Sequence, residues 1–162
     1  MCPLVPILID CVYKKQFKFD ITKKLFLTKN EGFEGEIAKS LDELTLDHPQ
    51  IKFREDLLGK YLIHILEDPY DDCFLKYLDW LAKTLTDTSD KKSTIHVDYI
   101  YLNALMGFVD SAIINAVRTL RLERNKEGDV LIAFNNRMRI QNDYYAKYYM
   151  NPYFINFMEK EV

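Results

Sequence analysis

Hydrophobic and polar positions along the chain change their spacing near residue 33, and this change divides the predicted elements into two groups. Before it, Val5–Val12 and Gln16–Ile21 are rich in β-branched and aromatic residues, and Phe17 alternates with Phe19. Such segments predict two paired strands. The segment His48–Phe53 offers a short third strand. Together these segments predict a small three-stranded sheet on the N-terminal side of the chain.

From Phe33 onward, apolar residues recur mainly at intervals of three and four, which is the spacing of an amphipathic helix. This periodicity predicts helices over residues 33–44, 55–67, 72–85, 99–109, 112–123, 130–135 and 143–150. The polar stretch Thr86–Thr94 predicts an exposed loop. Pro152 is expected to end the last helix, because proline lacks a backbone N–H. Strands followed by helices indicate an α+β fold.

Composition favours one globular domain with a substantial core. The chain has 162 residues, of which 48% are hydrophobic and 14% aromatic. A formal net charge of −3 provides no strong attraction to nucleic acid or to an anionic membrane. No apolar run approaches the roughly 20 residues of a membrane span. The three cysteines, Cys2, Cys11 and Cys73, are an odd number without CxxC spacing, which favours reduced thiols in a cytoplasmic or nuclear protein.

Motifs of catalysis, metal binding and cofactor binding are absent from the sequence. The glycines form neither a GxGxxG motif nor a phosphate-binding loop, and G-x-S-x-G does not occur. His48, His64 and His96 are too far apart for common zinc motifs. Asp71 and Asp72 are adjacent, and adjacent residues of a helix do not face each other. We therefore expect no catalytic residue, no metal and no cofactor, and predict a binding protein rather than an enzyme.

The C-terminal region holds six aromatic rings between Tyr144 and Phe154. Large apolar surfaces outside a compact core often mark partner-binding sites, so these rings are interpreted as a docking surface. Changing Tyr145 and Tyr149 to alanine is then expected to abolish partner binding without unfolding the protein. The alternative is that the rings belong to the core, in which case the same double change unfolds it.

Three stretches resemble the Skp adaptor family of SCF ubiquitin ligases. They are "IKFREDLLGKYLIHIL", "TIHVDYIYLNALMGFVDSAIINAVRTL" and "AFNNRMRIQNDYY". The resemblance implies a BTB/POZ fold with an elongin C-like core over residues 1–110 and C-terminal partner-binding helices over residues 111–162. It also implies a non-enzymatic adaptor that binds an F-box-like helical partner and links it to a cullin.

By the same resemblance, the F-box-like partner contacts apolar residues on the C-terminal helices. These residues are Ile113, Ile114, Val117, Leu120, Leu131, Phe134, Ile140, Tyr144, Tyr145, Tyr148 and Tyr149. Gly107 and Phe108 stand where the family presents an Asn-Tyr pair to the cullin, so the cullin contact is expected to be weak.

Two other hypotheses remain open at this point. One is a BTB-fold scaffold outside ubiquitin transfer, in which the tail binds another partner or a second copy of the chain. The other, which the net charge disfavours, is a small RNA- or anion-binding protein. Its contacts would come from the arginines interleaved with tyrosines, namely Arg118, Arg121, Arg124, Arg137 and Arg139.

Overall fold

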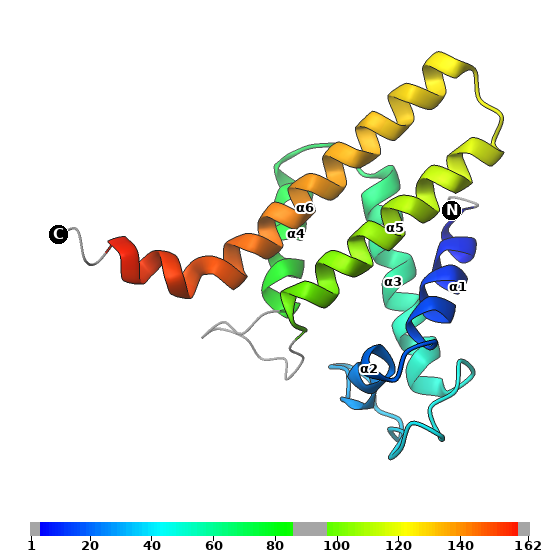
Figure 1. Cartoon of the computed structure of the whole chain (residues 1–162), viewed down its shortest axis with the longest axis vertical. Helices are drawn as coiled ribbons and strands as arrows, with labels where there is room; N and C mark the ends of the chain where they lie inside the picture. Colours follow the sequence, from blue (N-terminus) through cyan, green and yellow to red (C-terminus); the bar gives the residue numbers. More distant parts are fainter. Residues whose placement is uncertain (1–3, 86–96, 159–162) are drawn as a thin grey trace.

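The computed structural model describes residues 4–85 and 97–158, with side chains up to Met150. Every regular element within these ranges is a helix, as Figure 1 shows. In chain order they are α1 (Val5–Gln16), α2 (Asp20–Lys23), the 3-10 helix η1 (Lys24–Leu27), α3 (Pro49–Glu67), α4 (Asp72–Leu85), α5 (Tyr99–Thr119) and α6 (Arg124–Met158). The expected α+β BTB/POZ fold with a three-stranded sheet is therefore wrong.

The first expected strand, Val5–Val12, lies within helix α1. Its residues Val5, Leu8 and Val12 are all buried, and their spacing of three and four places them on one face of a helix. A short apolar run satisfies strand and helix patterns equally well, and only the packing partner decides between them. Here α1 packs against α3 and α5, so the helical face is the buried one.

The other two expected strands are also helical or irregular. Gln16–Ile21 covers the end of α1, a turn and the start of α2. His48–Phe53 is the start of α3, where Pro49 occupies the first turn and His48 Nδ1 accepts a hydrogen bond from the backbone N–H of Gln50 at 3.2 Å. A proline at that position and a side-chain cap are start signals of a helix.

The expected helix at 33–44 is wrong, because residues 28–48 form turns and bends without regular structure. Gly32 at the start of this segment has a φ of +80°, a left-handed conformation that interrupts a helix. Ala38 and Leu44 are nevertheless buried, at 3% and 0% exposure. Of the apolar positions whose spacing suggested this helix, Leu44 is a core residue, whereas Ile37 is 37% exposed.

The C-terminal helices are fewer and longer than expected. The prediction for α4 is confirmed at both ends, whereas the helices expected at 99–109 and 112–123 form one helix, α5. Ser111 does not break α5, because its hydroxyl donates to the carbonyl of Gly107 at 2.9 Å. The helices expected at 130–135 and 143–150 also form one helix, α6, which continues past Pro152. The division expected at residue 110 falls within α5.

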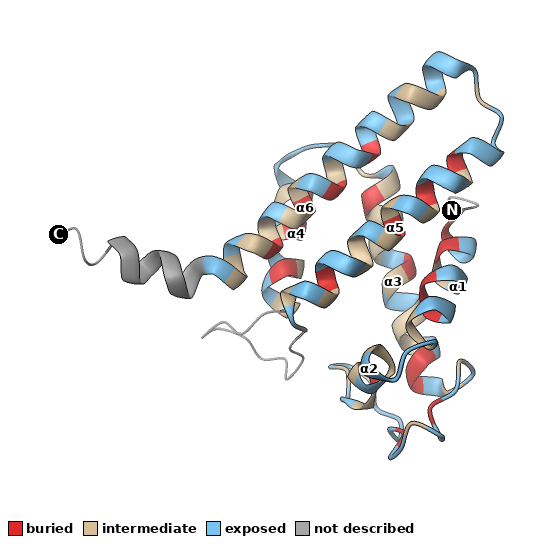
Figure 2. Cartoon of the chain, in the orientation of Figure 1, coloured by how far each residue is buried: buried red, intermediate tan, exposed pale blue. Residues whose placement is uncertain are grey.

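In the described part of the chain, the main core lies among α1, α3, α4, α5 and α6. Helix α5 lies alongside α6 (Figure 1), α4 packs against α6, and α1 packs against both α3 and α5. Buried residues line the inward faces of these helices (Figure 2). By length and composition, α5 could cross a membrane, since it has 21 residues and a hydropathy of 1.5. Its residues Leu102, Val109, Ile113 and Val117 are buried on one face, as in the core helix of a globular protein.

Candidate ligand-binding site

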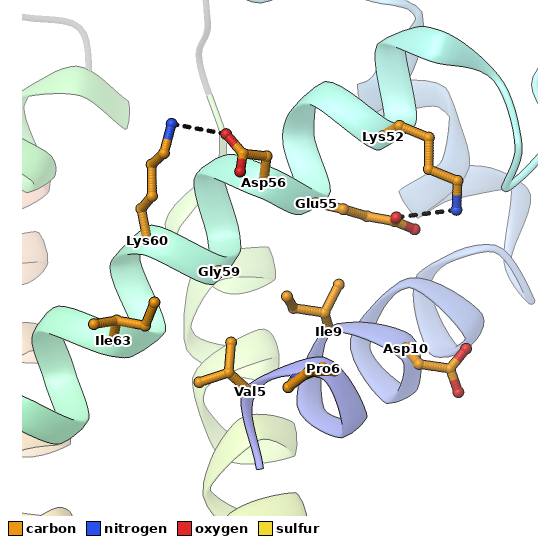
Figure 3. Close-up of a pocket in the computed structure, with 10 residues that line it drawn as sticks. All are labelled: Val5, Pro6, Ile9, Asp10, Lys52, Glu55, Asp56, Gly59, Lys60 and Ile63. Carbon is orange, nitrogen blue, oxygen red and sulfur yellow. Dashed lines mark hydrogen bonds and ion pairs between the residues drawn. The ribbon is translucent and has the colours of Figure 1, made fainter. Parts of the chain in front are cut away.

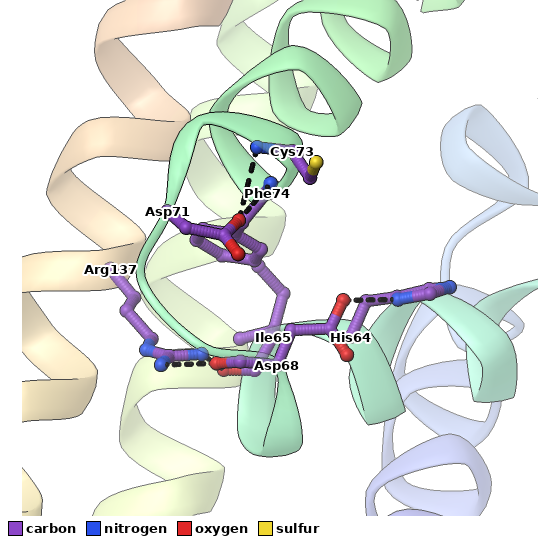
Figure 4. Close-up of polar contacts among 7 residues, drawn as sticks. All are labelled: His64, Ile65, Asp68, Asp71, Cys73, Phe74 and Arg137. Atoms are coloured by element: carbon purple, nitrogen blue, oxygen red, sulfur yellow. Dashed lines mark hydrogen bonds and ion pairs between the residues drawn. The ribbon is translucent and has the colours of Figure 1, made fainter.

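Arg137 of α6 fixes the corner where α3 turns into α4 (Figure 4). Its guanidinium donates to the carbonyls of Ile65 and Asp68, both at 2.7 Å, and lies 5.0 Å from the centre of the Phe74 ring. Arg137 therefore stabilises the end of α3, where carbonyl groups lack helical partners. This arginine, one of those considered for binding RNA, is committed to an internal contact.

Two further polar contacts hold the same corner together. His64 Nδ1 lies 2.6 Å from Asp68 Oδ2, and its ring lies 4.5 Å from that of Tyr77 on α4. Asp71 Oδ1 accepts hydrogen bonds from the backbone N–H groups of Cys73 and Phe74, each at 3.0 Å, and so caps α4 (Figure 4). These contacts hold α3 and α4 together at the corner.

A cavity of about 240 Å³ opens where the first half of α3 and the last residue of α4 meet η1, the end of α1 and the first turns of α5. We call this cavity the α1–α3–α5 pocket. Apolar side chains from α3, α4, α5 and the segment before α5 make up much of its wall: Leu57, Leu58, Leu85, Val97, Leu102 and Leu105. An apolar cavity with a few polar groups is the usual form of a small-molecule site.

Tyr13 and Arg54 are the two polar side chains of the pocket with the most unusual environment. Burial raises the pKa of the Tyr13 phenol, although the nearby Arg54 acts in the opposite direction, so Tyr13 is neutral. Burial also lowers the pKa of Arg54, which remains a cation at neutral pH. Tyr13 and Arg54 thus offer a phenol hydroxyl and a positive charge, and Gln16, Thr28 and Asn30 are the other polar residues of the wall.

The segment that closes one side of the pocket is held by Gln50, which is fully buried. Its amide Nε2 donates to the carbonyls of Phe26 and Thr28, at 2.6 and 3.0 Å. The Phe26 ring packs 5.6 Å from Tyr13 and 5.7 Å from Phe17, centre to centre. These contacts fix η1 against α1 and α3, so this wall is formed before any ligand binds.

A second, more open groove lies between α1 and α3 (Figure 3). Its charges are already paired: Lys52 lies 3.0 Å from Glu55, and Lys60 lies 2.7 Å from Asp56. Gly59 lies at the closest approach of the two helices, where an added Cβ would be 3.2 Å from the Ile9 side chain. The groove reflects the close packing of the helices and offers no unpaired charge to a ligand.

The residues expected to bind an F-box-like partner fall into different environments. Ile113, Val117, Phe134 and Tyr145 are core residues, between 1% and 5% exposed. Partly buried against the core are Leu131, Ile140, Tyr144, Tyr148 and Tyr149. Only Ile114 and Leu120 are exposed, at 39% and 47%. These eleven residues therefore do not form one free surface.

The tyrosines and Phe108 make contacts within the chain, whereas Gly107 does not. Tyr145 is buried, and the Tyr149 hydroxyl donates to the carbonyls of Leu85 and Val97. Phe108 packs against the core, whereas Gly107 is exposed with nothing within 4 Å of an added Cβ. The side chains of the last rings, from Tyr153 onward, lie outside the described residues.

Sequence reasoning missed the residues of the α1–α3–α5 pocket, and one signal could have found part of it. In α1 the buried residues recur at three and four, and Tyr13 directly follows the last of them. Assigning this segment to a strand concealed that helical face. Nothing in the sequence indicates that Arg54 and Leu85 share a cavity, because they lie on different helices.

Comparison with known protein families corrects the earlier interpretation. The family model described as Protoglobin matches residues 2–154. No curated protein and no solved structure matches the chain. The resemblance to Skp adaptors is therefore wrong, and with it the expected F-box partner, cullin contact and role in ubiquitin transfer. The resemblance rested on short segments that share a pattern of apolar positions. Helices of unrelated folds can have the same apolar spacing, so such segments do not identify a family.

Protoglobin membership suggests a haem-binding, gas-sensing globin-like protein, and the pocket allows a test of whether its residues fit haem. Globins hold haem iron on a proximal histidine. Among the described lining residues no histidine, cysteine or methionine occurs, and α4 contributes Leu85. Tyr13 could ligate iron only as a phenolate, which burial disfavours. The cavity volume of about 240 Å³ is also below the roughly 300–1,000 Å³ of typical ligand sites. The residues that the structure describes do not fit a haem.

Proposed function

Because this chain belongs to the protoglobin family, we propose that it is a globin-type domain that senses a small molecule in the α1–α3–α5 pocket. The observation that carries the proposal is this pocket itself, which lies where α1, α3, α4 and α5 meet η1 and has largely apolar walls. A globin fold also packs its helices around a ligand pocket. The proposal makes the chain a binding module and assigns no reaction to it.

Benzene tests whether the apolar part of the pocket accepts an apolar ligand, since an apolar cavity of roughly 150 Å³ is large enough to bind it. We expect benzene to shift the ¹³C-methyl NMR signals of Leu58, Leu102 and Leu105. A bulky side chain inside the pocket, in Leu105→Trp, should prevent the shifts. Ile100→Trp is the matched control, because Ile100 lies on the same helix and is 72% exposed. Shifts confined to residues outside the pocket, or retained in Leu105→Trp, would contradict the proposal.

Haem-based gas sensing is the second candidate function, favoured by the family and by one feature of the sequence. His96, which lies outside the described residues, directly precedes the pocket residue Val97. Hemin titration followed by absorbance in the Soret region separates the two candidates. We expect no histidine-ligated spectrum from the wild-type chain, and the appearance of one in Leu85→His. A wild-type histidine-ligated spectrum that disappears in His96→Ala would establish haem binding instead.

A further inference from the structure

Arg54 is a half-buried cation without a counterion in the α1–α3–α5 pocket. One of its terminal nitrogens, Nη2, donates to the carbonyl of Thr28 at 2.5 Å, and the guanidinium lies 5.3 Å from the centre of the Phe26 ring. Its Nε–H is buried and has no hydrogen-bond partner among the described residues. Because Nε is shielded from solvent, a ligand oxygen can reach the guanidinium only through its terminal nitrogens, of which Nη1 makes no hydrogen bond to a described residue.

The acidic residues near Arg54 do not neutralise it. Glu55, its neighbour in α3, pairs with Lys52 at 3.0 Å. No ion pair of Arg54 occurs within the described ranges 4–85 and 97–158. Buried charges in proteins are normally paired, and a planar guanidinium prefers a carboxylate or phosphate. The missing partner is therefore an anion that enters from outside the chain.

We infer that the α1–α3–α5 pocket binds a medium-chain fatty acid or a similar amphiphilic carboxylate. The inference rests on the proposed function and specifies its ligand. The carboxylate accepts hydrogen bonds from Arg54, and the Tyr13 hydroxyl is a further donor in the pocket. The hydrocarbon chain lies against Leu57, Leu58 and Leu105, which exclude water from it.

The size of the cavity limits the length of the hydrocarbon chain. A cavity of about 240 Å³ is comparable with the roughly 150 Å³ apolar cavity that holds benzene, so it suits a small ligand. We choose octanoate as the probe, because its hydrocarbon chain is short and it dissolves well enough to titrate.

Calorimetric titration with octanoate, 1-octanol and octylamine tests the inference, because the three share a chain and differ in the head group. Octanoate should bind tightest and octylamine weakest. Arg54→Gln should weaken octanoate by roughly ten- to hundredfold, the effect of losing hydrogen bonds between charged groups. The same variant should bind 1-octanol as the wild type does, which shows that it is folded and the pocket intact. Lys60→Gln, an exposed change on the same helix, controls for the loss of one positive charge.

Each outcome of the titration has a definite consequence. Equal binding of octanoate and 1-octanol in the wild type, unchanged in Arg54→Gln, would overturn the carboxylate assignment and leave the proposed ligand-binding function standing. If none of the three compounds binds and benzene does not bind either, the carboxylate assignment and the proposed function both fail. If Arg54→Gln and Lys60→Gln weaken octanoate binding equally, the cause is the loss of one positive charge and not a contact with Arg54. That result would also overturn the assignment.

Discussion

At the scale of single residues, two buried glutamines show how much one side-chain amide matters. Gln141 of α6 is fully buried, and neither its Nε2 nor its Oε1 has a hydrogen-bond partner among the described residues. Each unsatisfied buried group costs about 1–3 kcal/mol. We expect Gln141→Met to raise the free energy of unfolding by about 1–3 kcal/mol, measured by urea denaturation.

Gln50 is the matched control for Gln141, because it is equally buried and its Nε2 bonds two carbonyls. Gln50→Met leaves the carbonyls of Phe26 and Thr28 without this donor. The free energy of unfolding should fall by roughly 1–3 kcal/mol. A loss of stability in Gln141→Met comparable to that in Gln50→Met would show that Gln141 has a partner, and the first expectation would then be wrong.

At the scale of elements, two glycines within helices have different surroundings, one on an open surface and one in a close helix contact. Gly107 of α5 has nothing within 4 Å of an added Cβ, whereas Gly59 of α3 lies under Ile9 of α1. Alanine is a better helix former than glycine by about 1 kcal/mol, so Gly107→Ala should stabilise the chain by up to that amount. Gly59→Leu should destabilise it, because its larger side chain forces α1 away from α3. Thermal melts followed by circular dichroism at 222 nm measure both; a stabilising Gly59→Leu would contradict the assigned helix contact.

The sequence was a good guide to some elements and a poor one to others, for reasons of packing. Helix α4 was predicted at both ends, since its apolar stripe is regular and Asp71 supplies a clear cap. Helix α1 was missed because a run as short as Val5–Val12 fits two periods. Helices α5 and α6 were each divided at polar residues, although in α6 two of these, Arg137 and Gln141, face the rest of the chain. The pocket could not be predicted, because its walls come from five segments that only tertiary packing brings together.

At the scale of the whole molecule, Asp79 links stability to pH by joining α4 to α6. Partial burial raises the pKa of Asp79, but hydrogen bonds from Tyr148 at 2.6 Å, Lys147 at 2.9 Å and neighbouring Lys83 outweigh burial and hold it below its ordinary value. Since the folded pKa is depressed, the stabilisation is complete above the unfolded value of about 3.9 and is lost as pH falls through the folded pKa. Asp79→Asn should therefore lower the Tm at pH 7 and have little effect near pH 2. An equal loss of Tm at both values would exclude an ionised Asp79 as the cause.

Binding of a carboxylate in the α1–α3–α5 pocket should also stabilise the entire fold, because the pocket exists only when its helices are assembled. A ligand that binds the folded chain alone adds about 2.7 kcal/mol at a concentration one hundred times its Kd. For a domain of this size, that corresponds to a rise in Tm of roughly 5–11 °C. We expect octanoate to produce this rise in the wild type and in Lys60→Gln, and a much smaller one in Arg54→Gln at the same concentration. Leu105→Trp, whose bulky side chain obstructs the cavity, should show none. A rise of equal size in Leu105→Trp would mean that octanoate stabilises the chain from another surface, and the pocket would then not be its site.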